Sequence, residues 1–310
     1  MHGTIHIDAA LTNVAVQYKN DTFIADRILP VVPVTKQSDK WFIYGKEALR
    51  IYDDIRVKGA EAKEVVSWSV TSSDNYYCDV RALKDLIADE DRDNADVPLD
   101  PDINTTEGLV KMRLLRREYD VANYLFNTAT FSGKTAAVTT KWDDYTNSAP
   151  IRDIEAKKEI VHDAIGLEPN VVVIGYSVFK KLKHHPDMLE RIKYTQKGVL
   201  TPALLADILD VDEVIVGGGL KESAVEGQTS SLTKMWGKYA LIMYRQPGAN
   251  TLKVPALGFI PTWKLYGNKT YKVKKYRVEE RNGDMVEVES AYDVILACSS
   301  AGYLLSAVIS

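Results

Sequence analysis

The chain of 310 residues has few residues of the kinds that serve redox, metal and acid–base chemistry. Its two cysteines, Cys78 and Cys298, form no CxxC pair and have no metal-ligand spacing, which is typical of small apolar residues in a reducing compartment. Only five histidines occur, and two of them fall within the first six residues. Because histidine is the most common general base, this scarcity argues against an enzyme.

Long hydrophobic runs are absent too. No apolar stretch reaches the roughly 18 residues that a membrane span needs, and the first residues lack the basic and apolar regions of a secretory signal. We therefore expect no membrane partner and an intracellular location. The formal net charge of -4 and the pI of about 5.8 argue against a protein that grips nucleic-acid phosphates. With 45% hydrophobic residues, the chain can still build a full core in two lobes.

Nucleotide-binding and catalytic motifs are missing as well. Residues 217–219 are three glycines after a predicted strand, but GGGLKES does not complete GxGxxG, and no GxxxxGK[ST] occurs. Neither GxSxG nor HExxH is present. We predict that the chain is not an enzyme and has no cofactor, and a soluble α/β enzyme remains the less favoured alternative.

Two stretches suggest a metal site at first sight. Four aspartates have offsets that resemble a calcium loop: Asp89, Asp91, Asp93 and Asp100. Asn94, however, stands where that loop needs glycine, and the last ligand would be Asp instead of Glu. The adjacent His184 and His185 would point in different directions on a helix. A helix C-terminus just before Pro186, where histidine favours the negative end of the dipole, explains them more simply. We predict no metal site, and we expect 85–103 to be a solvated approach to the next helix.

The most informative feature is the stretch 104–127, which predicts one long helix. Asn104 can cap its first turn, and Glu107 completes a capping-box-like start. Apolar residues such as Leu109 and Met112 recur at helical spacing. The residues before this helix are charged and extended, so they cannot offset their ordering entropy alone. We predict that the first eighty-odd residues do not pack on their own chain and find their partners on neighbouring copies.

An α/β pattern and a hairpin follow the long helix. Alternating helices and short buried strands are predicted at 151–166, 170–174, 176–184, 186–193, 204–209 and 213–216. A polar, glycine-rich loop follows at 217–234. Strands at 271–280 and 284–289 flank Asn282 and Gly283, and both of these turn positions tolerate the positive φ of a tight hairpin.

Several stretches, taken in their order along the chain, carry a family resemblance. The first ones are FIADRILPVVPVTKQSDKWFIY, DEDRDNADVPLD and LLRREYDVANYLF. The later ones are PNVVVIGYSVFKKLKHHPDMLERIKYTQKG and the run from VGGG to MWGK. Together they cover most of the chain, and they resemble one branch of the major capsid proteins of tailed bacteriophages, whose shell-forming fold is called the HK97 fold.

This resemblance implies an α+β fold of the HK97 type, with an extended N-arm, an E-loop β-hairpin, a long spine helix, a P-domain and an A-domain. The expected parts are the N-terminal arm (1–38), the E-loop region (39–84), the P-domain (85–150) with the spine helix (104–127), the A-domain (151–260), the returning P-domain β-hairpin (261–292) and a C-terminal segment in the A-domain (293–310). The loop 217–234 would form an axial contact.

The resemblance also implies a function in assembly. The chain would self-assemble into hexamers and pentamers that form an icosahedral or prolate shell, enclosing phage dsDNA without sequence-specific binding. It would be located in the virion capsid after assembly in the host cytoplasm. The expected partners are copies of itself, a portal protein at one vertex and a decoration protein; the start of the arm near Met1 implies a separate scaffold or none. The alternative of the same class is an encapsulin-like or gene-transfer-particle shell.

The expected contacts between subunits lie in the arm, the charged loop, the axial loop and the late hairpin. They are Phe23, Ile28, Val31, Val34, Trp41, Arg50, Arg56, Lys58, Trp68, Lys221, Glu222, Gln228, Lys274, Arg277 and Glu287. Aromatic side chains suit such contacts because they offer a large area at a low entropy cost. No catalytic, cofactor-binding or metal-ligating residue is assigned.

Overall fold

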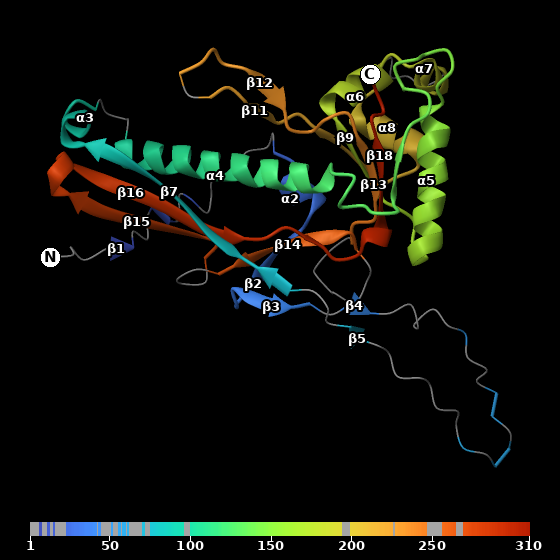
Figure 1. The fold of residues 1–310 in the computed structure, drawn as a ribbon, viewed down its shortest axis with the longest axis horizontal. Helices are drawn as coiled ribbons and strands as arrows, with labels where there is room; N and C mark the ends of the chain where they lie inside the picture. The colour runs from blue at the N-terminus through green and yellow to red at the C-terminus, as the bar shows by residue number, and fades with distance from the viewer. Residues whose placement is uncertain are drawn as a thin grey trace.

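The structure is a computed structural model of the chain, shown in Figure 1. It describes residues 6–7, 11–12, 15, 23–41, 43–44, 51, 55–56, 58–59, 61, 70–71, 75–95, 100–193, 199–225, 227–246, 256–264 and 269–310. These residues form a seven-stranded sheet with a long helix beside it, and a five-stranded sheet with shorter helices.

The seven-stranded sheet is built around one long hairpin. Its strands follow the order β1 (His6–Ile7), β15 (Tyr271–Val278), β16 (Gly283–Tyr292), β14 (Gly258–Trp263) and β17 (Ile295–Leu296), with β2 (Val31–Val34) on β14 and β7 (Asp79–Ala88) on β16. The side chains of Val273, Val286 and Val288 are buried with Leu109 and Val110 of the long helix. This apolar cluster holds the helix against the sheet.

The long helix, α4, spans Pro101–Leu125, so it begins before the predicted start at 104. The Asp100 carboxylate caps it by accepting hydrogen bonds from the amides of Asp102 (2.9 Å) and Ile103 (3.3 Å). The prediction that Asn104 caps this helix is wrong, since its amide already donates to the Asp100 carbonyl. A proline at the first helical position explains the earlier start, because it has no N–H to satisfy and its φ already suits a helix.

The five-stranded sheet has the order β10 (Glu213–Gly217), β9 (Val171–Gly175), β13 (Ala240–Met243), β18 (Gly302–Ser306) and β8 (Thr135–Ala137). Its helices are α5 (Pro150–Ile165), α6 (Tyr176–Leu182), α7 (Pro186–Ile192) and α8 (Pro202–Leu209). The predicted strands at 170–174 and 213–216 are confirmed as β9 and β10. The predicted helix at 151–166 is confirmed as α5, which ends at Gly166 in the left-handed region with φ 71°.

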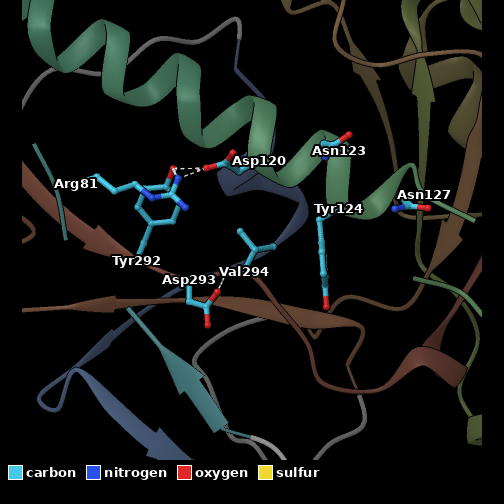
Figure 2. A pocket seen from close by; sticks show the side chains of 8 residues that line it. All are labelled: Arg81, Asp120, Asn123, Tyr124, Asn127, Tyr292, Asp293 and Val294. Carbon is cyan, nitrogen blue, oxygen red and sulfur yellow. Dashed lines mark hydrogen bonds and ion pairs between the residues drawn. The ribbon is translucent and has the colours of Figure 1, made fainter. Parts of the chain in front are cut away.

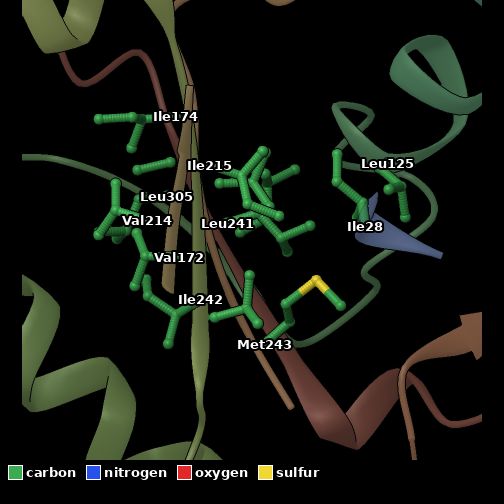
Figure 3. Packing of buried hydrophobic residues seen from close by; sticks show 14 of the residues in the cluster. Ile28, Leu125, Val172, Ile174, Val214, Ile215, Leu241, Ile242, Met243 and Leu305 are labelled. Carbon is green, nitrogen blue, oxygen red and sulfur yellow. The ribbon is translucent and has the colours of Figure 1, made fainter. Parts of the chain in front are cut away.

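The prediction that the first eighty-odd residues do not pack on their own chain is wrong. Leu11, Ala15, Trp41, Tyr76 and Cys78 are buried in apolar clusters of the same chain. Residues 23–34 pack against the chain as well. Helix α2 (Ala25–Ile28) buries Ile28 and Leu29 fully in the largest apolar cluster of the molecule. Figure 3 shows Ile28 and Leu125 packed beside side chains of the five-stranded sheet. Strand β2 then pairs in parallel with β14. The apolar residues of this stretch share one helical face, so burying them offsets the ordering cost.

The turn of the long hairpin differs from a two-residue turn. A short 3₁₀ helix, η3 (Glu279–Arg281), precedes Asn282, which has the expected positive φ of 43°. Gly283 already pairs with Val278 in the ladder and does not have a positive φ. A Cβ at Gly283 would lie 2.5 Å from the carbonyl oxygen of Ile87 on β7, so glycine is required by close approach instead of by φ.

Shorter elements complete the described part of the chain. They are β3 (Ser38–Lys40) paired with β6 (Asn75–Tyr77), β4 (Ile43–Tyr44) with β5 (Val70–Thr71), β11 (Leu220–Glu222) with β12 (Leu232–Lys234), α3 (Asp89–Asp93) and η4 (Ser299–Ala301). The expected solvated approach at 85–103 is therefore partly wrong, because β7 and α3 occupy its first half. The described helices include none with both the length and the apolar character to cross a membrane.

Candidate interaction surfaces

A buried carboxylate on the long helix joins three separate segments. The Glu118 side chain is fully buried. Its Oε2 accepts hydrogen bonds from the amides of Ile24 (3.0 Å) and Ala25 (2.7 Å), and its Oε1 accepts one from Trp236 Nε1 (2.6 Å). Burial raises the pKa of Glu118, and the three donors act in the opposite direction. The start of α2, the middle of α4 and the loop before β13 therefore meet at one group.

Ion pairs hold helix α2 on both sides. Asp26 pairs with Arg117 of α4, and Arg27 pairs with Glu213 of β10. Arg245 binds Glu213 at 2.8 Å and also donates to the carbonyl of Arg27. Burial alone would raise the pKa of Glu213, but the hydrogen bonds from Arg27 and Arg245 hold it below its ordinary value. These pairs tie α2 to the long helix and to the five-stranded sheet at once.

The predicted contact residues of the arm lie mostly against their own chain. Ile28 is fully buried in the chain's own core, so it has no side-chain surface for a neighbour and is removed from the contact set. Trp41 is 8% exposed and meets Phe259 edge-on, with 6.3 Å between ring centroids. Phe23, Val31 and Val34 are partly buried and pack against these same apolar clusters. The correction for Ile28 follows from the position of this residue on the apolar face of α2.

The charged loop, 46–64 within the predicted E-loop region, carries the most exposed apolar side chains of the described residues. Ile51 is 97% exposed and Ile55 is 76% exposed. Arg56 and Lys58 are exposed, so they are available for the predicted contact, whereas Arg50 and Trp68 lie outside the described residues. Exposure of two isoleucine side chains to water is unfavourable in free energy, which favours a partner that covers them.

A projecting hairpin formed by β11 and β12 occupies most of the predicted axial loop (Figure 1). Lys221 places its Nζ 4.3 Å from the ring centroid of Tyr119 on α4. Glu222 accepts hydrogen bonds from Ser230 Oγ and from the amides of Ala224 and Ser231, which lower its pKa to about 2. Gln228 is exposed. Three apolar side chains are also exposed on this hairpin: Leu220, Val225 and Leu232.

The predicted contacts of the late hairpin are paired within the chain. Lys274 binds Glu287 at 3.1 Å and also Glu289, across the β15–β16 ladder. Burial alone would lower the pKa of Lys274, but the two carboxylates outweigh it, and the net direction is upward. Arg277 makes a two-pronged hydrogen bond to Asp89 of α3, at 2.5 and 2.6 Å. Any contact of these residues with a neighbour would compete with internal pairs.

A cavity of about 270 Å³ lies under the end of α4, between β7 and the segment after β16 (Figure 2). Tyr292 Oη donates to Asp120 at 2.9 Å, and Arg81 pairs with the same carboxylate. Burial and the nearby Asp120 raise the pKa of Tyr292 to about 12. Asp293 accepts from the amides of Tyr77 and Val294. The charged groups of this lining are engaged with one another or with backbone, which indicates a structural junction.

Of the two stretches that resemble metal sites, the second contains a histidine with a structural role. The described residues contain no group of three or more His, Cys, Asp or Glu side chains placed to hold a metal ion. His185 is buried, with Nε2 2.9 Å from Ser148 Oγ, and its Nδ1 accepts the amide of Asp187 at 3.2 Å. The predicted helix C-terminus lies here, because α6 ends at Leu182, and His185 in addition caps the N-terminus of α7. Burial lowers its pKa.

Glu118 and its partners were not among the predicted site residues. The donors come from positions 93 and 118 residues away in the sequence, and no local pattern links them. A glutamate within the apolar periodicity of the long helix was the only available signal. The same holds for His185, whose partner Ser148 lies 37 residues away.

Comparisons with known proteins show which fold this architecture belongs to. No protein-family model matches the chain. A crystal structure of a phage-related protein from Bordetella bronchiseptica superposes with a TM-score of 0.78 at 23% identity, over 99% of each chain. The capsid of the cyanophage P-SCSP1u superposes with a TM-score of 0.59 at 12% identity, over 93% of this chain and 89% of that one. The fold is thus that of HK97-type capsid proteins.

Two sequence relatives are named major capsid protein. One, from Pseudomonas phage JBD67, is 28% identical over 83% of each chain. The other, from Burkholderia phage BcepMu, is 30% identical over 309 residues, which is 97% of this chain and 96% of the relative. Because this similarity runs through both sheets and the long helix, the chain belongs to the family of phage major capsid proteins.

Proposed function

We propose that this chain forms the shell of a phage head by self-assembly into hexamers and pentamers that enclose the genome. The observation that carries the proposal is its 30% identity to a phage major capsid protein over nearly its whole length. The exposed apolar side chains of the charged loop and of the β11–β12 hairpin are the surfaces that assembly would cover. The role is structural, and the location is the virion capsid.

In this proposal each part of the chain has the role of the corresponding part of a phage major capsid protein. Residues 39–84 act as the E-loop region, which extends toward a neighbouring subunit with Ile51 and Ile55 exposed on it. The P-domain comprises α4 and the seven-stranded sheet, and the A-domain comprises the five-stranded sheet and its helices. The β11–β12 hairpin contributes to the axial contact, where Leu220, Val225 and Leu232 would be covered. The arm, 1–38, retains a contact role only outside α2.

The finer partners are also proposals. A portal protein at one vertex, a decoration protein, and a separate scaffold are the partners that a shell of this class would use. The net charge of -4 supports a shell that contains DNA without gripping it, because the 43 acidic residues outnumber the 39 basic ones and repel phosphates on balance. Weak and salt-insensitive DNA binding by the isolated subunit is expected.

An encapsulin has the same fold. The encapsulin SrpI of Synechococcus elongatus superposes with a TM-score of 0.53 at 12% identity. Fold alone therefore does not separate the two kinds of shell, whereas the higher sequence identity is with phage capsid proteins. The phage head is accordingly the favoured function.

Negative-stain electron microscopy of the expressed, purified chain tests the proposal. We expect polyhedral shells or capsomer rings with fivefold or sixfold symmetry. A homogeneous small particle that does not assemble at high concentration, with or without scaffold from the same phage, would contradict it. Nucleic acid extracted from particles made during infection identifies a phage head, and a single enriched host enzyme identifies an encapsulin-like shell.

A further inference from the structure

Glu118 is poorly explained by the stability of its own helix. A buried carboxylate costs free energy, and an apolar residue of similar size would pack at least as well. Its three donors all come from segments outside α4, namely Ile24, Ala25 and Trp236. Such a group specifies how segments are placed relative to one another, since only one arrangement satisfies both of its oxygens.

Helix α2 is suited to couple the position of α4 to the position of the five-stranded sheet. With four residues it is too short to be stable alone, so its position depends on what holds it. On one side Glu118 and Arg117 of α4 bind its amides and Asp26. On the other side Arg27 reaches Glu213 of the five-stranded sheet. We call α2 with Glu118, Arg117 and Glu213 the α2 clamp.

The Trp236 side of Glu118 is closely packed. A Cβ added at Gly217 would lie 2.2 Å from the Trp236 ring, and one added at Gly219 would lie 3.6 Å from Glu118 Cγ. The Trp236 ring also meets Phe126, just after the end of α4, edge-on at 5.0 Å between centroids. The indole is thereby fixed in the position from which its N–H reaches Glu118, so α4 and the loop before β13 cannot shift independently.

We propose that the α2 clamp sets the angle between the body formed by α4 with the seven-stranded sheet and the body formed by the five-stranded sheet, and thereby the curvature of the assembled shell. The second clause rests on the proposed function. The angle between neighbouring subunits decides the diameter at which a shell closes, so a change in the angle within the subunit is expected to change that diameter. Loosening the clamp is expected to relax that angle without unfolding either body.

The test compares Glu118→Gln with Glu159→Gln, a matched change at an exposed position of α5. A glutamine side chain has only one acceptor oxygen, so its amide N–H₂ would face the donors of α2 or Trp236. Hydrogen exchange of the unassembled subunit should show the amides of Ile24 and Ala25 exchanging about tenfold faster or more in E118Q. Electron microscopy of assembled particles should show a shifted or broader diameter distribution in E118Q, with E159Q equal to the unaltered chain.

The outcomes separate the two proposals. If the unaltered chain does not assemble, the proposed function fails, whereas the exchange result still reports on the clamp. If E118Q exchanges faster at α2 but closes shells of the unaltered diameter, the inference about curvature is overturned. If E118Q does not fold, as judged by circular dichroism, Asp26→Asn replaces it, because the Asp26 side chain is 49% exposed. D26N should broaden the diameters in the same way, and unaltered diameters there would also overturn the inference.

Discussion

Two glycines illustrate how the effect of a single residue depends on its surroundings. A Cβ at Gly108, inside α4, would meet no heavy atom within 4 Å, whereas one at Gly283 would meet the Ile87 carbonyl oxygen at 2.5 Å. We expect Gly108→Ala to raise the free energy of unfolding by about 0.5–1 kcal/mol, because alanine loses less entropy in a helix. Gly283→Ala should lower it by about 1–3 kcal/mol, because the β7–β16 pairing must shift.

Urea unfolding of the purified subunit, followed by circular dichroism, measures both changes. The two variants serve as each other's control, since the same methyl group is added in each. Equal destabilisation by both would show that the close approach of β7 at Gly283 is not the deciding factor.

Glu222 gives an expected pH dependence at the same scale. Its pKa lies at about 2, mainly because of the hydrogen bond from Ser230, and then because of two backbone amides. A carboxyl whose pKa is lowered on folding stabilises the structure above the unfolded pKa, and this contribution is lost as the pH falls through the folded pKa. The β11–β12 hairpin should therefore keep its conformation down to about pH 3 and loosen near pH 2.

Hydrogen exchange at the Ser231 amide, measured against pH, checks this expectation. Glu222→Gln should expose that amide at every pH, because the charge that attracts the donors is gone. A hairpin in E222Q with unaltered protection would contradict the role assigned to the carboxylate.

At the scale of elements, helix α4 begins at a different residue from the one that the local sequence pattern predicted. The structure assigns the cap to Asp100, which binds two amides, whereas Asn104 lies inside the helix with an exposed side chain. We expect Asp100→Ala to cost about 1 kcal/mol of stability. Asn104→Ala should be neutral or stabilise by up to about 0.5 kcal/mol, because alanine is the better helix former.

The same urea titration measures this pair of variants. A larger loss in N104A than in D100A would favour the helix start predicted from the sequence. The local signals were ambiguous because two residues four positions apart can each cap a helix. The proline at 101 decided between them by favouring the first helical position.

At the scale of the whole molecule, the charged loop should matter for assembly and little for folding. Ile51 is 97% exposed and Ile55 is 76% exposed in the single chain, so replacing both with serine removes little internal packing of these side chains. We expect the double variant to unfold at the same urea concentration as the unaltered chain and to assemble with a markedly lower yield. Light scattering during assembly, together with electron microscopy, gives the yield.

The exposed Val199→Ser change is the control for this variant, because it removes an apolar side chain just before α8 instead of in the loop. Normal shell yield from the loop variant would contradict the proposed E-loop contact. A lower midpoint of unfolding would show that the isoleucines pack within their own subunit.

The sequence alone determined those features that depend on residues close to one another along the chain. Periodicity over 151–216 predicted α5, β9 and β10, and Asn282 marked the turn of the long hairpin, because repeating apolar spacing and turn chemistry are local. The sequence stretches that resemble phage major capsid proteins, taken in their order along the chain, also indicated the shell-forming family, which the comparisons confirm.

Only the tertiary structure decided where the N-terminal segment packs and what Glu118 binds. The amides of α2 and the indole of Trp236 reach Glu118 from 93 and 118 residues away, and nothing local in the sequence specifies such a meeting. Ile28 likewise lies in the core because α4 and the five-stranded sheet leave a space for one apolar helical face there. Long-range packing, in which many segments are satisfied together, is the physical reason that these features escape local patterns.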